Sequence, residues 1–302
     1  MKLSDCKVDF HVSGWISEVK PEKGFSKILA ELIEPHPKTL KYITDNLYSR
    51  SSNRVVFLLN YFQPKYERLK GQAISLTNQG YEIDDNNIDT FIGITNNRKD
   101  WMYLVRGYEI MSDRGHVIIA GIKDVYPFEN SHYTYGPNLE KVLSWATKKE
   151  ALTIPAHPLH TNYLEKSLLA SLALAGRRDP SGLSLGLSQE TLEEFRDDFD
   201  AIEAFSLSIS PSQSRRIREF AKKIDKPILA NSDGTIMSAF SSYNEFGSID
   251  FTSPESMRDS IRQALLSREK VKPIYVQETD GSRLKEKVLH FFMNFVQERE
   301  NF

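Results

Sequence analysis

The sequence predicts a single parallel β/α barrel of about seven strands. Segments with the period of a β-strand alternate with segments of helical period along most of the chain. Polar and ionisable residues gather where successive strands end, and barrel proteins form their sites at those ends. An open, doubly wound sheet is the alternative fold that the same alternation allows.

The composition indicates a globular protein in a reducing compartment. Of the 302 residues, 40% are hydrophobic and 26% are charged, which is enough apolar side chain for a sizeable core. The formal net charge of −2 gives no broad attraction to nucleic acid. Cys6 is the single cysteine, so an internal disulfide is excluded. No stretch has the apolar run of a signal peptide or a membrane span, so we expect a cytoplasmic protein without a membrane partner.

The first part of the chain supplies two strands that end in polar residues. The expected elements, in order, are a strand at 8–12 (VDFHV), mostly helix at 21–66, an apolar run at 54–62 (RVVFLLNYF) that fits a strand or a buried helix, a helix at 66–80 and a strand at 89–95 (DTFIGIT). His11 lies near the end of the first strand, and Asn97 and Arg98 follow the last. A lone histidine such as His11 is by itself more often structural than a ligand.

Residues 105–122 read as two strands joined by a polar turn. Glu109 lies in the otherwise apolar first strand, and His116 opens the second. A buried carboxylate is unfavourable unless something positive neutralises it, and a metal ion does this well. An ordinary salt-bridged or turn-facing pair is the structural alternative.

The remaining segments continue the alternation and complete one domain of residues 1–302. They are a helix at 138–149, a strand at 152–156, an exposed insertion, a strand at 199–205 (FDAIEAF) with Glu203 near its end, a helix at 212–224, a strand at 226–230, the segment 257–266 and a strand at 272–277. His157 directly follows one strand and Asp233 another. We expect helical additions at about 20–85 and 159–198, and a C-terminal helix at about 282–298.

Five of these segments resemble motifs of the PHP (polymerase and histidinol phosphatase) superfamily. VDFHVSG resembles the family's Asp-Leu-His-x-His-Thr motif, and FIGITNN resembles its strand that ends Thr-Asp-His. GYEIMSDRGHVIIAGI, IPAHP, and FDAIEAF with KPILANSDGT are similar to the later motifs, in the family's order, over roughly residues 8–250. The resemblance implies a PHP-like domain, which is a distorted (β/α)7 TIM-like barrel that binds divalent metals.

The resemblance also implies a set of metal ligands. The positions that match family ligands are His11, Glu109, His116, His157 and Asp233, with Glu18 as a further candidate. Family histidines are replaced by Ser13, Asn97 and Thr235. We therefore expect two divalent ions (Zn, Mn or Fe) rather than three, because the remaining ligands suit two sites that share Glu109.

The implied function is a metal-dependent phosphoesterase that hydrolyses a nucleotide, a sugar phosphate or a similar small molecule with a metal-activated water. Glu109, His157 and Asp233 would be the catalytic residues. Candidate cations for the substrate phosphate, chosen by position alone, are Arg98, Lys123, His160, Arg177 and Arg178. A catalytically inactive PHP-like binding or scaffold protein is the alternative, and a sugar- or nucleotide-binding barrel outside this family is a third reading.

Overall fold

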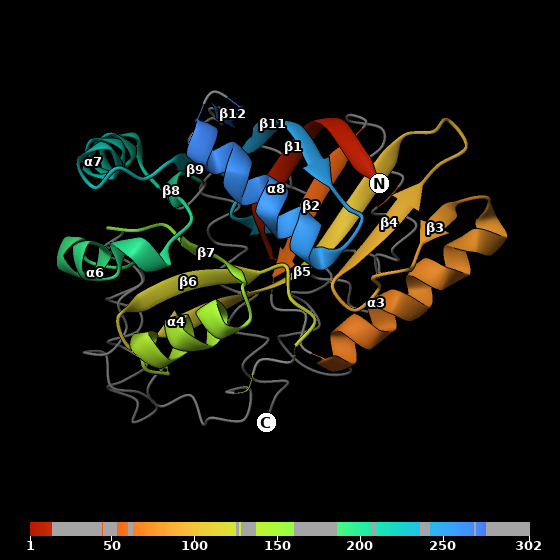
Figure 1. The fold of residues 1–302 in the computed structure, drawn as a ribbon, viewed down its shortest axis with the longest axis horizontal. Coiled ribbons are helices and arrows are strands. Elements are labelled where there is room, and N and C mark those ends of the chain that lie inside the picture. Colours follow the sequence, from red (N-terminus) through yellow and green to blue (C-terminus); the bar gives the residue numbers. More distant parts are fainter. Residues whose placement is uncertain are drawn as a thin grey trace, which may run out of the picture.

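The protein is an α/β protein with a large, open, mixed sheet and few helices in its described part (Figure 1). The computed structural model describes residues 1–13, 44, 53–59, 63–124, 127, 137–159, 186–206, 209–235, 242–268 and 270–275. In chain order the elements are β1 (Lys2–Ser13), β2 (Arg54–Leu59), α3 (Gln63–Ser75), the 3₁₀ helix η1 (Leu76–Gln79), β3 (Glu82–Asp84), β4 (Phe91–Thr95), β5 (Trp101–Ser112), β6 (Gly115–Ala120), α4 (Leu139–Lys148), β7 (Leu152–Pro155), α6 (Gln189–Glu194), the 3₁₀ helix η3 (Arg196–Asp198), β8 (Ile202–Phe205), α7 (Pro211–Lys223), β9 (Ile228–Ala230), β10 (Gly234–Thr235), β11 (Ser242–Asp250), α8 (Pro254–Ser267) and β12 (Val271–Tyr275).

The main sheet has ten strands, in the order β12-β11-β1-β2-β5-β4-β3, with β10 beside β1 and β6 between β5 and β7. Strands β1, β2 and β5 are parallel to one another. Strand β11 is antiparallel to β1, and β4 and β6 are antiparallel to β5. Strands β8 and β9 form a separate two-stranded parallel sheet.

The predicted seven-stranded barrel is therefore wrong, and the PHP-like TIM barrel implied by the family resemblance is wrong with it. A β/α barrel needs a crossover of a dozen or more residues, about one helix, between successive parallel strands. Here β5 already begins at Trp101, so only the turn at residues 96–100 separates it from β4. Such a short connection forces the two strands into an antiparallel hairpin, in which Thr95 pairs with Trp101.

Strand β11 was not predicted, and it pairs with β1 where a barrel would have a parallel neighbour. Its sequence, SYNEFGSID, carries polar residues at most positions. Burial nevertheless alternates along most of the strand, and one buried position is Asn244. A buried asparagine removes the apolar period on which the prediction of a strand depends.

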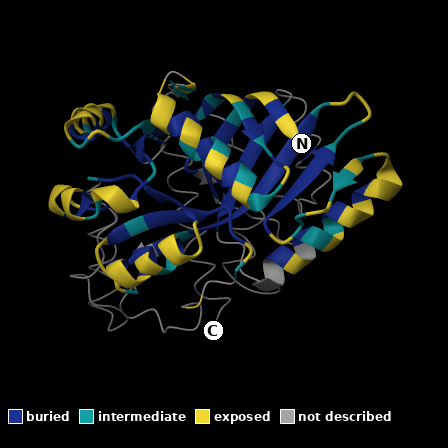
Figure 2. Cartoon of the chain, in the orientation of Figure 1, coloured by how far each residue is buried: buried dark blue, intermediate teal, exposed yellow. Residues whose placement is uncertain are grey.

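The centre of the sheet is covered on both faces, which accounts for the continuous apolar run in β2. Val55, Phe57 and Leu59 face one core, which is closed by α8. Val56 and Leu58 face the other, which is closed by α3. Figure 2 shows the strands buried and the outer faces of both helices exposed. The run at 54–62, which fitted a strand or a helix, is thus a strand over Arg54–Leu59.

Two predicted helices are confirmed, and side chains cap the start of each. Asn138 caps α4, because its side chain accepts a hydrogen bond from the Lys141 backbone N–H. Ser210 and Gln213 form a capping box at the start of α7. Helix α4 packs on β5 and β6, and α7 packs on the small β8–β9 sheet. The helices thus cover the strands that carry the candidate site.

The predicted additions fall partly outside the described residues. Within 20–85, the described part contains strands β2 and β3 as well as helix α3. Within 159–198, it contains α6 and η3. The helix expected at 282–298 lies wholly outside the described residues. Among the helices that are described, none is long and apolar enough to cross a membrane, and the cytoplasmic location stays a prediction.

Replacing Gly71 by Ala is expected to stabilise the protein. Gly71 is exposed in α3, and an added Cβ would meet nothing within 4 Å. Because alanine restricts the unfolded chain and favours a helix, the free energy of unfolding should rise by about 0.5–1 kcal/mol in a urea titration. Gly80→Ala is the contrasting variant and should destabilise, since Gly80 has φ +86°. A loss of stability in Gly71→Ala would contradict the expectation.

Candidate metal centre

Five of the predicted ligands come together beside the ends of β1, β5 and β7. His11 lies on β1, Glu109 on β5 and His116 on β6. His157 follows β7, and Asp233 lies between β9 and β10. In the β5–β6 hairpin Glu109 pairs with Ile118, so His116 is its diagonal neighbour, within reach of a long side chain.

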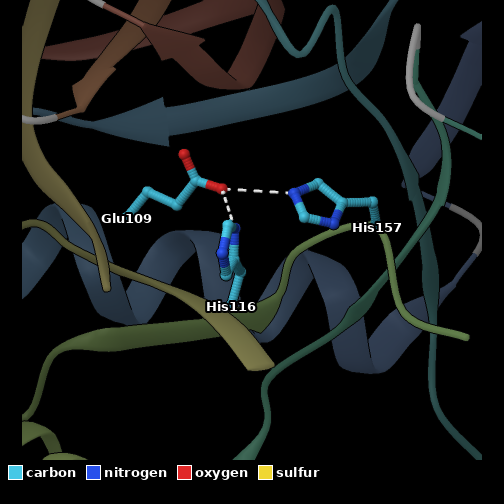
Figure 3. A group of neighbouring side chains, drawn as sticks. All are labelled: Glu109, His116 and His157. Atoms are coloured by element: carbon cyan, nitrogen blue, oxygen red, sulfur yellow. Dashed lines mark hydrogen bonds and ion pairs between the residues drawn. The ribbon is translucent and has the colours of Figure 1, made fainter. Parts of the chain in front are cut away.

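Glu109, His116 and His157 form a triad that could bind a metal ion, with their ligand atoms all within 4.8 Å of one another. One carboxylate oxygen, Glu109 Oε1, lies 2.9 Å from His116 Nδ1 and 3.2 Å from His157 Nε2. Figure 3 shows both imidazole rings directed at this oxygen, that of His116 from β6 and that of His157 from the loop after β7. The triad is thus one carboxylate and two imidazoles, the ligand types that zinc and its neighbours prefer.

The other oxygen of Glu109 faces a second group of donors. Glu109 Oε2 lies 3.3 Å from His11 Nε2, and this nitrogen lies 3.2 Å from Asp233 Oδ1. His11 Nε2 is thus buried between two carboxylate oxygens. Glu109 therefore joins two groups of potential ligand atoms.

Prediction from the sequence noted Glu203 near a strand end but gave it no role. Its fully buried carboxylate lies 3.1 Å from His11 Nδ1 and accepts a 2.6 Å hydrogen bond from the His157 backbone N–H. Asp9 is also fully buried, and its Oδ1 accepts hydrogen bonds from the backbone N–H groups of His11 and Ser232. The signal that could have found both is an acidic residue inside an apolar strand, the same signal that singled out Glu109.

Two of the site residues have a left-handed backbone. His157 has φ +31° and Asp233 has φ +46°. Non-glycine residues pay strain for this conformation, and such strain collects at functional sites. The hydrogen bond from the His157 N–H to Glu203 holds the first turn, and that from the Ser232 N–H to Asp9 holds the second.

A buried amide network joins β9 to β1 where no backbone ladder does. Asn244 on β11 accepts a hydrogen bond from the Ala230 N–H and donates to the carbonyl oxygens of Ala230 and Val8. Asn231 accepts from the Phe10 N–H and donates 2.8 Å to Glu203 Oε1. These side chains fix the small sheet against the large one, and so fix Asp233 against His11.

The centre has an excess of buried negative charge. Burial lowers the pKa of His11, but the carboxylates of Asp233, Glu203 and Glu109 raise it well above its ordinary value. Burial likewise opposes charging of His157, yet its hydrogen bond to Glu109 and the same three carboxylates raise its pKa to about 9. Burial would raise the pKa of Glu109, but the neighbouring imidazoles hold it well below its usual range. A bound cation would balance the same charge.

The two candidate phosphate-binding cations that the structure describes, Arg98 and Lys123, lie apart from this centre. Arg98 is exposed on the turn before β5, and the first residue of that strand, Trp101, is already about 26 Å from Glu109 at ~3.3 Å per residue. Lys123 follows the end of β6 that is farther from His116, and its side chain is exposed. Four other predicted residues lie outside the described residues, namely Glu18, His160, Arg177 and Arg178.

The three positions at which family histidines are replaced lie in two different places. Asn97 lies on the exposed β4–β5 turn, because β4 runs opposite to β5 and its end points away from the centre. Ser13 and Thr235 pair with each other where β10 joins β1. Asn97 therefore lies apart from the five candidate ligands.

Comparison with known proteins gives no family for the chain. No protein-family model and no curated protein matches it. Among solved structures, the chain is similar to PsfC from Pseudomonas syringae PB-5123, with 10% sequence identity and a TM-score of 0.49, over 99% of this chain and 100% of that chain. The assignment to the PHP superfamily is wrong, because the described strands form an open mixed sheet rather than that family's barrel.

Proposed function

We propose that this protein binds two divalent metal ions through His11, Glu109, His116, His157 and Asp233 and hydrolyses a phosphate ester. The observation that carries the proposal is the position of Glu109. Its two carboxylate oxygens face separate donor groups, with His116 and His157 on one side and His11 on the other. A bridging carboxylate of this kind is how a pair of metal ions is commonly held.

The distances between the donor atoms are compatible with a shared metal ion in each group. Two ligand atoms that are each about 2.1 Å from one ion lie about 3.0–3.4 Å apart in tetrahedral or octahedral geometry. His11 Nε2 is 3.3 Å from Glu109 Oε2 and 3.2 Å from Asp233 Oδ1, which lies in this range. Imidazole with carboxylate favours zinc, manganese or iron over magnesium or calcium.

When bound, such a metal pair polarises a phosphoryl oxygen and supplies hydroxide from water at neutral pH. The residues of the chain would hold the ions, and the centre is least buried at Glu109 and His116. The side chains of Glu109 and His116 keep 10% and 16% of their surface exposed, whereas those of His11 and Asp233 keep 0% and 1%. Substrate and water would therefore approach from the Glu109 and His116 side.

Metal binding without catalysis is a second candidate. The burial of His11 and Asp233 favours it, because a fully enclosed ion has no position for substrate. A screen of phosphomonoesters and phosphodiesters with added Mn²⁺ or Zn²⁺ distinguishes the two. Hydrolysis that is lost in Glu109→Gln supports the enzyme, and metal binding with no hydrolysis of any member of the panel supports the second candidate.

Single substitutions are expected to remove the two ions separately. His157→Ala removes a ligand beside Glu109 Oε1, so elemental analysis of the purified protein should find about one ion fewer per chain. Asp233→Asn keeps the shape but loses the charge beside His11, so the other ion should be lost or weakened. Losses that spread over both ions would reflect the shared Glu109.

The control is Asp225→Asn. Asp225 also has a left-handed backbone, φ +59°, but it is exposed and paired with Arg268. The metal content of the Asp225→Asn variant should equal that of the parent protein. A parent protein that contains no metal after growth and titration with Zn²⁺ and Mn²⁺ would overturn the proposed function.

A further inference from the structure

We infer that Glu203 is a positioning residue of the metal centre, which fixes the ring tautomer of His11 and the backbone of His157 without itself supplying a ligand atom. The inference rests on the proposed function for its metal. Glu203 lies on β8, in the small sheet, whereas His11 belongs to the large sheet and His157 follows a strand of it. The fully buried side chain of Glu203 therefore links the small sheet to two candidate ligands of the large sheet.

The contact with His11 selects which ring nitrogen faces the metal. Both oxygens of Glu203 accept hydrogen bonds, from Asn231 Nδ2 and from the His157 N–H, so His11 Nδ1, 3.1 Å from Oε1, is taken as a further donor that carries a proton. The lone pair for a metal is then on Nε2, which is the atom directed at Glu109 and Asp233. Histidine ligands in metalloproteins commonly donate their second N–H to a carboxylate in this way.

The contact with His157 acts on the backbone rather than the ring. Glu203 Oε2 accepts the His157 N–H at 2.6 Å, at a residue whose left-handed φ of +31° is otherwise unfavourable. This bond helps to direct the imidazole of His157 at Glu109 Oε1, 3.2 Å away. Loss of the bond would let the turn relax and move the ring away from the metal.

Both oxygens of Glu203 are occupied by donors, which is why glutamine is not an equivalent replacement. Oε1 faces His11 Nδ1 and accepts from Asn231 Nδ2 at 2.8 Å, while Oε2 faces the His157 N–H. A glutamine at this position must direct its NH₂ group at one of these donors. Two facing donors repel, and a buried one is left unsatisfied.

The test compares Glu203→Gln with Asp200→Asn. Asp200 lies three residues earlier, just before β8. Its Oδ2 accepts a 2.8 Å hydrogen bond from the backbone N–H of Thr153 on β7, at the ends of β7 and β8 that are farther from His157 and Glu203. Titration calorimetry with Zn²⁺ should show affinity reduced about 10–100-fold in Glu203→Gln and changed less than about threefold in Asp200→Asn. Melting temperatures of both metal-free variants would show how far each loses stability.

A spectroscopic measurement tests the tautomer directly. In the zinc-loaded parent protein, long-range ¹H–¹⁵N correlation of the histidine rings should show His11 protonated at Nδ1 and coordinated through Nε2. Coordination through Nδ1 would overturn the inference even if the Glu203 variant fails to fold. Affinity that is unchanged in Glu203→Gln, or reduced equally in Asp200→Asn, would also overturn it while the proposed function stands. A parent that binds no zinc would overturn both.

Discussion

Replacing Glu109 by Gln is expected to release both metal ions together and to lower metal affinity by more than about 100-fold. Glutamine keeps the shape of the side chain and one oxygen, but it removes the charge that faces both donor groups. Its NH₂ group must also replace one of the two oxygens, either Oε1 beside His116 and His157 or Oε2 beside His11. The measurement is metal content by elemental analysis, followed by titration with Zn²⁺ and Mn²⁺.

The matched control is Glu82→Gln on the edge strand β3. Glu82 is exposed and pairs with Lys99 beside the β4–β5 turn, away from the metal centre. The metal content of the Glu82→Gln variant should not change, because the Glu82 carboxylate faces none of the candidate metal ligands. If Glu109→Gln keeps two ions while its fold is intact by circular dichroism, Glu109 is a structural ion-pair residue. The proposed function then falls with it.

Replacing Gly115 by Ala is expected to destabilise the protein by about 3 kcal/mol or more. Gly115 has φ +138°, which L-residues rarely adopt. An added Cβ would lie 2.7 Å from the backbone carbon of Gly186 and the backbone nitrogen of Leu187. Backbone atoms cannot move aside as a flexible side chain can, so the β5–β6 hairpin itself must shift.

The shift should also weaken the metal centre, because His116 is the next residue along the chain and Glu109 lies on the paired strand. Gly247→Ala is the control. Gly247 lies on β11, where an added Cβ meets nothing within 4 Å, so its unfolding midpoint in urea should stay close to that of the parent. If Gly115→Ala unfolds at the parent's midpoint and keeps its metal affinity, the close approach to residues 186–187 is not a constraint on the hairpin.

Much of the local structure could be predicted from the sequence alone. The β5–β6 hairpin follows from alternating apolar residues on both sides of a polar turn. The helices α4 and α7 follow from apolar spacing and from the capping residues Asn138 and Ser210. The ionisable residues inside or just after apolar strands were also visible, and they include His11, Glu109 and His157. These features depend on residues near one another in the chain.

The barrel prediction failed in part because the predicted strand begins at residue 105, whereas β5 begins at Trp101 and leaves a connection too short for a parallel crossover from β4. A strand has the same apolar period whichever way it runs. The sequence pattern therefore does not reveal whether β4 ends near the metal centre or at the opposite end of the sheet. Strand β4 runs opposite to β5, and Arg98 lies at the far edge of the sheet. The main sheet stays open, and β8 and β9 pair only with each other.

The sequence by itself determined which side chains carry the candidate chemistry, and the tertiary structure decided which of them meet. Strand β6 is antiparallel to both β5 and β7, so β7 runs in the same direction as β5, which is parallel to β2 and through it to β1. The parallel directions of β1, β5 and β7 bring His11, Glu109 and His157 to one edge, even though no barrel forms. Glu203 joins them from a separate sheet through hydrogen bonds to His11 and His157, contacts between distant parts of the chain that no local pattern encodes.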